Sequence, residues 1–536
     1  MRCLLIYPKF PRTFWSFERV LELVGRKVLV SPLGLPTVAA LLPDSWEFRL
    51  VDRNIRAVTE DEWAWADIVL LSAMIVQRVD MADQIREAKK RGKPVAVGGP
   101  YPTSIPEDME RAGADYLVLD EAELTLPLFL DALEKGETGG TFTADGEKPD
   151  VTSTPVPRFD LYEMDAYDTM ALQYSRGCPF LCEFCDIITL YGRRPRTKTP
   201  QQILAELDLL YELGWRRSIL MVDDNFIGNK KNAKQMLRQL LEWQKEKGFP
   251  FTFNTEASID LAEDKELMRL MVACNFDSVF IGIETPDEEA LTITRKYQNT
   301  RKPLSDSVQS VIEHGLRPMG GFIIGFDGEK RGAGDRIVQF INDTAIPTAN
   351  FSMLQALPNT ALWDRLKKEN RLLDTDSDIN QTSLPNYVPQ RPMEELAHEY
   401  VEAFAAVYDP DRYLDRVYQC FLKLGPPGKQ GSSSKVVFPS WVEIRALLIL
   451  MWRQGVVRRT RWKFWHHLLS IGIRNGVVLP HYVAVCAHYE HFIEYRDIVR
   501  YEIEGHIENL RITDDDQYVA DNGLSVQDPV LETIDA

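Results

Sequence analysis

The first 133 residues alternate short apolar runs with segments of helical periodicity. Continuous apolar strands separated by helices are typical of a parallel sheet covered on both faces. We expect strands at Cys3–Tyr7, Phe48–Asp52, Ile68–Ser72, Pro94–Gly98 and Tyr116–Asp120, and helices at Leu35–Leu42, Met81–Arg91, Pro106–Ala112 and Glu121–Leu133. Such a sheet binds ligands at the carboxyl ends of its strands, where the turn Gly98–Thr103 lies.

A second alternation spans residues 166–375, after a polar segment at 134–165 that we expect to be a linker. Six βα units suit an open parallel (β/α)6 barrel, with its active site at the carboxyl ends of the strands. The expected strands are Leu172–Ser175, Ser218–Asp223, Phe251–Thr255, Ser278–Glu284, Met319–Phe326 and Asn350–Gln355, and the helices between them include Gln201–Leu213, Asn229–Lys247 and Lys265–Cys274.

From about Gln390 the pattern becomes helical, without strand alternation. The predicted fold class is therefore α/β, with a doubly wound Rossmann-like domain at 1–133, the open barrel at 166–375 and a mostly helical domain at 376–512. Residues 513–536 are acidic, and we expect a disordered tail there.

The composition of the chain argues against several classes of protein. A net charge of −18 argues against a nucleic-acid-binding protein, because neutralising phosphates requires a basic surface. Seven cysteines, an odd number, favour a reducing cytoplasm over a disulfide framework. No stretch reaches the length of about eighteen apolar residues that a membrane-spanning helix needs.

Three cysteines, Cys178, Cys182 and Cys185, form the motif CxxxCxxC. Structural zinc takes four ligands, usually with two-residue gaps, and no fourth Cys or His lies near. Cubane iron–sulfur clusters are normally held by four thiolates, so three leave one iron open for a ligand that is not protein. The spacing therefore favours a site-differentiated [4Fe–4S] cluster over zinc or a chance group of thiols.

This motif, with the aromatic Phe184 before its third cysteine, resembles that of the radical S-adenosylmethionine (SAM) enzymes. The resemblance implies that SAM chelates the open iron through its amino and carboxylate groups. Reductive cleavage of SAM then yields a 5′-deoxyadenosyl radical. It also implies an electron donor such as flavodoxin or ferredoxin.

Several expected strand ends resemble SAM-binding positions of that family. In that family, polar groups after the second barrel strand hold the SAM amino group. The alternative is that these residues only cap the next helix or face solvent. Glu284 would bind the ribose hydroxyls, and the glycines would let the backbone approach adenine. The family often has an acid three positions after the second glycine, where this chain has Gly328, so the match is partial. The candidates are Asp223, Asp224, Asn225, Glu284, Gly321 and Gly325.

The amino-terminal domain resembles the cobalamin-binding domain of one radical SAM subgroup. The resemblance implies that the nucleotide tail of cobalamin lies in a cleft at the strand ends, beside Gly98, Gly99, Pro100 and Thr103. The alternative is a flavodoxin-like module that binds something else or nothing. The histidines begin at His314, so this domain offers cobalt no imidazole ligand from below. A weakly ligated lower face would favour transfer of methyl as a radical.

Residues 445–489 contain no Asp or Glu, and hold seven Arg or Lys residues with Trp452, Trp462 and Trp465 interleaved. This pattern fits a solvated helical face, peripheral contact with the inner face of a membrane, or a partner protein. His481, Cys486, His488 and His491 could ligate a metal, but an ordinary helical surface explains them.

The runs 191–200, 222–229 and 354–364 bring the chain close to the hopanoid C-2 methylase group. This resemblance implies a C-methyltransferase that acts on an unactivated carbon of a lipid-like or other small molecule. One SAM would methylate cob(I)alamin, and a second would supply the radical that opens the substrate to methyl transfer. The alternatives are cyclisation or rearrangement without methyl transfer, and a non-catalytic cobalamin or redox sensor.

Overall fold

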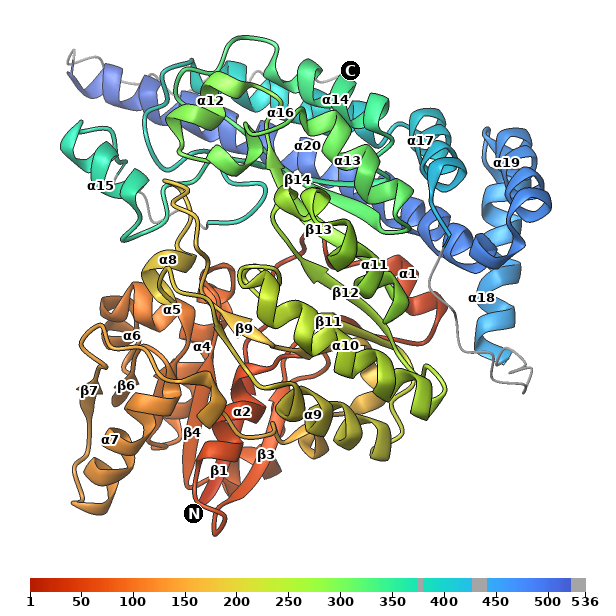
Figure 1. Cartoon of the computed structure of the whole chain (residues 1–536). Coiled ribbons are helices and arrows are strands. Elements are labelled where there is room, and N and C mark those ends of the chain that lie inside the picture. Colours follow the sequence, from red (N-terminus) through yellow and green to blue (C-terminus); the bar gives the residue numbers. More distant parts are fainter. Residues whose placement is uncertain (374–378, 427–440, 522–536) are drawn as a thin grey trace, which may run out of the picture.

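The computed structural model describes residues 1–373, 379–426 and 441–521. Two parallel sheets form its centre. In Figure 1 the amino-terminal domain, in red and orange, lies below the yellow and green barrel, and the carboxyl-terminal helices cross above both. The predicted α/β class, with three successive regions, is confirmed.

The first sheet has six parallel strands in the order β3-β1-β4-β5-β6-β7. The five strands expected here are present. The sixth, β7, lies within the expected linker and pairs with β6, so that part of segment 134–165 belongs to this sheet. The strands are β1 (Arg2–Tyr7), β3 (Glu47–Asp52), β4 (Ile68–Ser72), β5 (Val95–Gly98), β6 (Tyr116–Val118) and β7 (Gly140–Phe142).

Helices connect these strands and cover the sheet on both faces. All four helices expected from the sequence are found, with ends shifted by up to three residues. The helices of this region are α1 (Glu18–Leu23), α2 (Gly34–Leu41), α3 (Glu60–Trp65), α4 (Arg78–Lys90), α5 (Pro100–Ser104), α6 (Pro106–Ala112) and α7 (Ala122–Glu134).

One short strand of the amino-terminal region, β2 (Val28–Val30), joins the barrel sheet instead of the first sheet. It pairs in parallel with β8, with Val28 opposite Tyr167. The buried Ser31 extends this contact, because its hydroxyl accepts the Ala171 N–H at 3.0 Å. The two domains therefore share a sheet, which fixes their relative orientation.

The barrel sheet has seven parallel strands in the order β15-β14-β13-β12-β11-β8-β2. Its strands beyond β2 are β8 (Tyr167–Leu172), β11 (Ser218–Met221), β12 (Thr252–Glu256), β13 (Phe276–Glu284), β14 (Arg317–Ile324) and β15 (Thr348–Met353). Its helices are α8 (Ile187–Leu190), α9 (Pro200–Glu212), α10 (Lys230–Lys247), α11 (Lys265–Ala273), α12 (Glu288–Ile293), α13 (Leu304–Glu313), α14 (Ala333–Thr344) and α15 (Ala361–Lys368).

The expected position of the first barrel strand, Leu172–Ser175, is wrong, because β8 ends at Leu172. Beyond Leu172 the chain leaves the sheet, and the N–H groups of Tyr174 and Ser175 donate to the Asp223 carboxylate instead of a strand. Ser175 and Arg176 form β9, which pairs antiparallel with β10 (Arg196–Thr197). This small hairpin encloses the cysteine motif.

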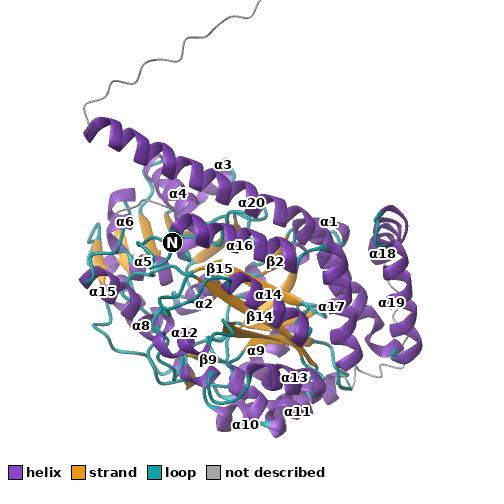
Figure 2. Cartoon of the chain, turned by 90° about the horizontal axis from the view of Figure 1, so that it is seen from above, coloured by secondary structure: helices purple, strands orange, loops and turns teal. Residues whose placement is uncertain are grey.

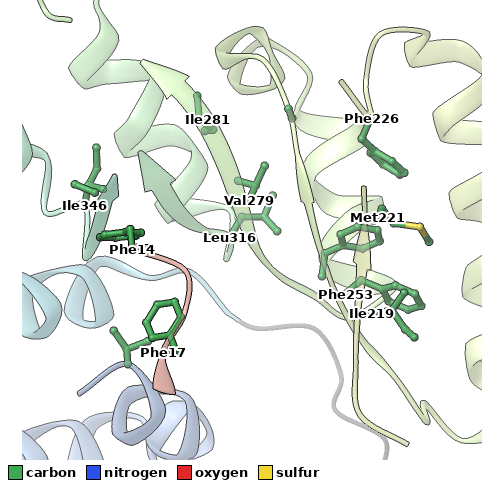
Figure 3. Packing of buried hydrophobic residues seen from close by; sticks show 14 of the residues in the cluster. Phe14, Phe17, Ile219, Met221, Phe226, Phe253, Val279, Ile281, Leu316 and Ile346 are labelled. Carbon is green, nitrogen blue, oxygen red and sulfur yellow. The ribbon is translucent and has the colours of Figure 1, made fainter. Parts of the chain in front are cut away.

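The carboxyl-terminal region is helical, with α16 (Met393–Val407), α17 (Pro410–Lys423), α18 (Trp441–Trp452), α19 (Arg461–Arg474) and α20 (Leu479–Asp521). Figure 2 shows α20 running across the whole molecule. The loop after β1 inserts Phe14 and Phe17 between these helices and the barrel (Figure 3), and Phe14 stacks on Phe492 at 4.8 Å. The expected acidic tail is helical up to Asp521, and the rest of it lies outside the described residues.

Candidate active site

The three cysteines lie in the loop between β9 and α8, at the carboxyl end of the barrel strands. Cys182 is buried, and Cys178 and Cys185 are partly buried. Gly177 precedes the first cysteine with φ +91°, and a Cβ there would lie 2.9–3.2 Å from three backbone carbonyl oxygens, those of Tyr191, Gly192 and Arg194. Only glycine lets the loop pass so close to this backbone.

The polar residues after β11 hold this loop in place. The Asp223 carboxylate accepts the Tyr174 N–H at 3.3 Å, and the Asp224 carboxylate accepts the Gly177 N–H at 2.7 Å. The Asn225 amide nitrogen lies 3.8 Å from the Cys178 sulfur. Helix capping is not their role, because Asn229 caps α10.

Ion pairs anchor the other side of the loop. Glu183, between the second cysteine and Phe184, pairs with Arg365 of α15 at 2.6 Å. The Gln298 amide nitrogen lies 3.5 Å from the Cys182 sulfur. The Phe184 ring packs 5.6 Å from the Phe326 ring. The sequence did not single out Glu183, Arg365 or Gln298, because their partners are more than 100 residues away.

Glu284 ends β13 as expected, in a left-handed conformation with φ +67°. The pairing of β13 with β14 shifts between Gly282 and Glu284, which is the signature of a bulge. The buried Glu284 carboxylate pairs with the buried Lys296, whose ammonium nitrogen lies 5.7 Å from the Phe184 ring centroid. Lys296, which sequence reasoning missed, brings a cation to the cysteine loop.

The two glycines of β14 make close approaches. A Cβ on Gly321 would lie 2.8 Å from the Phe280 ring, and Gly325 has φ +106°. The Gly325 N–H donates to Glu329 at 2.8 Å. Position 328 is glycine, and the neighbouring acid Glu329 contacts the backbone of the second glycine.

Three carboxyl groups meet at the ends of β11 and β12. Burial raises the pKa of Asp223 to about 7 and that of Asp224 to about 6. Burial and the charges of these two acids also raise the pKa of Glu256, which the sequence did not single out. Glu256 is the last residue of β12, and its side chain is exposed at the carboxyl end of that strand.

The thiols fit a cluster better than a single ion. In the described part of the chain, no three His, Cys, Asp or Glu side chains are placed to hold one metal ion. A cubane binds each thiolate through a different iron, so its ligands need not converge. Burial raises the pKa of Cys178 and of Cys185, which keeps these thiols protonated until a metal displaces the proton.

The carboxyl-terminal histidines, which could ligate a metal on sequence grounds, contact protein groups in the structure. His491 Nε2 lies 3.0 Å from the Phe14 carbonyl oxygen, and the His488 ring packs 4.7 Å from the Phe17 ring. His481 Nε2 lies 3.8 Å from the Asp277 carboxylate.

A cavity of about 340 Å³ opens at the carboxyl ends of the first sheet. All four residues expected there, Gly98, Gly99, Pro100 and Thr103, line it. A Cβ on Gly98 would lie 2.7 Å from the Val118 carbonyl oxygen, and Gly99 has φ +93° with the Ser72 hydroxyl against it. None of the described residues that line the cavity is histidine. The cavity fits the nucleotide tail of cobalamin, without an imidazole for cobalt.

The barrel forms the opposite wall of the same cavity, through Gln173, Arg176, Tyr191, Lys198 and Val222. Arg176 lies two residues before the first cysteine and pairs with Glu121 and Glu123 of the first domain at 2.8 Å each. One ion-pair network therefore joins the cavity wall to the cysteine loop.

A parallel-sheet domain with a cavity at its strand ends, closed by a barrel that carries a three-cysteine loop, defines a cobalamin-binding radical SAM enzyme. The sequence matches the B12 binding domain over residues 23–130, the radical SAM superfamily over 172–341, and a domain of unknown function (DUF4070) over 360–505. It is 65% identical to an uncharacterized methyltransferase of Synechocystis sp. over 94% of this chain and 93% of the relative.

The sequence is also 36% identical to the hopanoid C-2 methylase of Rhodopseudomonas palustris, over 91% of this chain and 92% of that protein. The fold is similar to that of TsrM from Kitasatospora setae with cobalamin and [4Fe–4S] cluster bound, with a TM-score of 0.60, 14% identity and coverage of 92% and 99%. This chain belongs to the family of cobalamin-dependent radical SAM methyltransferases. Its cofactors are a [4Fe–4S] cluster, SAM and cobalamin.

Proposed function

We propose that the enzyme transfers a methyl group to an unactivated carbon of a lipid-like substrate by radical chemistry. When bound, the cluster, SAM and cobalamin supply a 5′-deoxyadenosyl radical and a transferable methyl group. The observation that carries this proposal is the cavity shared by the two domains. Arg176, which lines the barrel side of this cavity, lies two residues before Cys178 in the sequence. A cofactor in this cavity and one at the cysteine loop would face a common reaction space.

The residues of the barrel would bind and position the reactants. Asp224 and Asn225 hold the cysteine loop, and Glu256 offers an acceptor at the carboxyl end of β12. We assign the SAM ribose to Glu284 and adenine to the backbone at Gly321 and Gly325, whose missing side chains leave room for the base. The apolar packing of Phe184 against Phe326 would keep water from the radical.

A lipid-like substrate is supported by the likeness to the hopanoid C-2 methylase along almost the entire length of both chains. We further propose a cytoplasmic enzyme that takes electrons from a flavodoxin or ferredoxin. All seven cysteines are free, which suits a reducing compartment.

The test begins with protein purified without oxygen from cells supplied with cobalamin, in which iron and cobalt per chain are measured. The enzyme is then given methyl-labelled SAM, a reduced flavodoxin and a polycyclic lipid extract. We expect label in a lipid, together with both 5′-deoxyadenosine and S-adenosylhomocysteine. A matched Cys178→Ala/Cys182→Ala/Cys185→Ala variant should lose iron and keep cobalt, since the cavity lies apart from the thiols.

Three outcomes would contradict the proposal in whole or in part. Deoxyadenosine without S-adenosylhomocysteine would indicate rearrangement without methyl transfer. Bound cobalamin with no SAM cleavage would indicate a sensor. Label in a water-soluble acceptor alone would remove the lipid assignment and leave the methyltransferase.

A further inference from the structure

The segment formed by α18 and α19, residues 441–474, lies at one edge of the molecule. Figures 1 and 2 both show it beside α17 and away from the two sheets. Its inner side packs on the protein: His467 stacks on Tyr418 of α17 at 4.1 Å, and Phe464 and Ile471 are fully buried.

Each of the two helices carries an exposed apolar stripe with the same spacing. On α18 the side chains of Trp441, Leu448 and Trp452 are 74%, 61% and 62% exposed. On α19 those of Trp462, Leu469 and Ile473 are 74%, 60% and 85% exposed. The spacing i, i+7, i+11 places the three residues of each helix on one face. Isolated exposed hydrophobic residues are common, but an exposed apolar stripe along a helix marks a binding surface.

The segment has one acid, Glu443 near the start of α18, and its cations divide into two groups. Acids of neighbouring helices neutralise four cations: Arg453 and Arg458 pair with Glu490, and Arg459 and Lys463 pair with acids of α17 or its N-cap. This pairing explains part of the acid-free run that the sequence showed.

The second group consists of Arg445, Arg461 and Arg474, all exposed. Among the residues that the structure describes, no ion pair involves these three arginines. Their charge is therefore available to an anionic surface, at the same end of the molecule as the two stripes.

The lengths of the helices decide how they would meet a bilayer. Helices of 12 and 14 residues are about 18 and 21 Å long, whereas the hydrocarbon core is about 30 Å thick. Among the described helices, none combines the length and the apolar character of a membrane-spanning segment. Short helices with Trp on one face and Arg nearby suit a position parallel to the bilayer surface.

We propose that the outer side of α18 and α19 is a membrane-binding surface for anionic phospholipid. The two stripes enter the interfacial layer, and Arg445, Arg461 and Arg474 bind the lipid phosphates. This inference rests on exposure and charge in the carboxyl-terminal region, so it goes beyond the proposed reaction and does not depend on it.

The experiment measures binding of the full-length protein to vesicles by flotation. The vesicles are pure phosphatidylcholine or phosphatidylcholine with phosphatidylglycerol, and we expect binding to the anionic vesicles that weakens with salt. Neutralising the three arginines (Arg445→Gln/Arg461→Gln/Arg474→Gln) should weaken it about 100-fold, since each basic residue at such a surface contributes about fivefold. The control Arg86→Gln/Lys302→Gln/Lys330→Gln removes the same charge from exposed positions elsewhere and should bind normally.

A second variant tests the stripes. Trp452→Ser/Trp462→Ser/Ile473→Ser should abolish binding, while Tyr501→Ser, at a side chain that is 81% exposed on α20, should have no effect. Because these side chains are exposed, the thermal midpoint of each variant should match that of the parent protein. Absence of binding to anionic vesicles, or equal binding by both stripe and control variants, would overturn the proposal. So would a dimer that the stripe variant converts to monomer, because a second copy would then cover this surface.

Discussion

Asp224 accepts a hydrogen bond from the backbone N–H of Gly177 at 2.7 Å, which joins the end of β11 to the residue before the first cluster cysteine. With the Asp223 contacts to Tyr174 and Ser175, it makes the second barrel strand a support for the cysteine loop. The position of the thiols thus depends on residues that do not bind the cluster. This arrangement leads to a prediction at Gly177 itself.

Gly177→Ala should prevent assembly of the cluster. The added methyl group would lie within 3.2 Å of three carbonyl oxygens, at a backbone φ of +91°. The backbone strain alone costs about 1–3 kcal/mol, and relieving the contacts moves the loop. We expect most of the iron to be lost after anaerobic reconstitution, measured as iron per chain.

The control for this variant is Gly214→Ala. Gly214 has nearly the same φ, +89°, but a Cβ there would meet no atom within 4 Å. Gly214→Ala therefore introduces the same backbone strain as Gly177→Ala but no close contacts with other atoms. Equal loss of iron in both variants would show that strain, and not the packing of the cysteine loop, is responsible.

Gly99→Ala should prevent cobalamin binding and leave the cluster intact. At φ +93° its methyl group would collide with the Ser72 hydroxyl in the wall of the cavity. Gly113→Ala is the matched control in the same domain, because its φ is +95° and its nearest neighbour would lie at an ordinary 3.7 Å. The measurement is cobalt and iron per chain. Retention of full cobalt by Gly99→Ala would place cobalamin elsewhere.

The Glu284–Lys296 pair predicts an asymmetric effect on stability. Lys296→Met leaves a buried carboxylate without its cation, which costs about 3–5 kcal/mol. The double variant Lys296→Met/Glu284→Gln removes both charges and should recover much of this loss. Urea denaturation of cofactor-free protein measures both. A double variant as unstable as Lys296→Met alone would show that the two side chains do not act as a pair.

The alternation of strands and helices predicted most of the strand ends, although it placed the strand before the cysteines too late in the chain. The choice of Asp224, Glu284 and the Gly98–Gly99 turn at those ends came from the resemblance to known families, not from the alternation. Contacts between distant segments could not be predicted this way. Lys296 and Arg365 look like ordinary surface cations in the sequence, and only the fold brings them to Glu284 and Glu183. The short apolar run Val28–Val30 likewise gives no sign of which sheet it joins.

The raised pKa of Glu329 predicts that the cofactor-free protein loses stability as pH rises. Burial raises its pKa from 4.5 to about 7, so the folded state holds this proton more tightly than the unfolded chain does. Stability is then fully present below pH 4.5 and falls as pH rises toward 7, by up to about 3 kcal/mol. Glu329→Gln keeps an oxygen for the Gly325 N–H and cannot ionise, so its thermal midpoint should change less between pH 5 and pH 8.

Glu399→Gln separates this effect from a general loss of charge. Glu329 and Glu399 both pair with Arg391. For Glu399, the hydrogen bonds to Arg391 and to the Gly332 N–H outweigh burial and lower its pKa, so it stays ionised throughout this range. Its substitution should lower the midpoint by a similar amount at every pH and leave the slope unchanged. If Glu329→Gln had the same slope as the parent protein, the Glu329 carboxyl would already be ionised at pH 5, and its hydrogen bond from Gly325 would be made by a carboxylate.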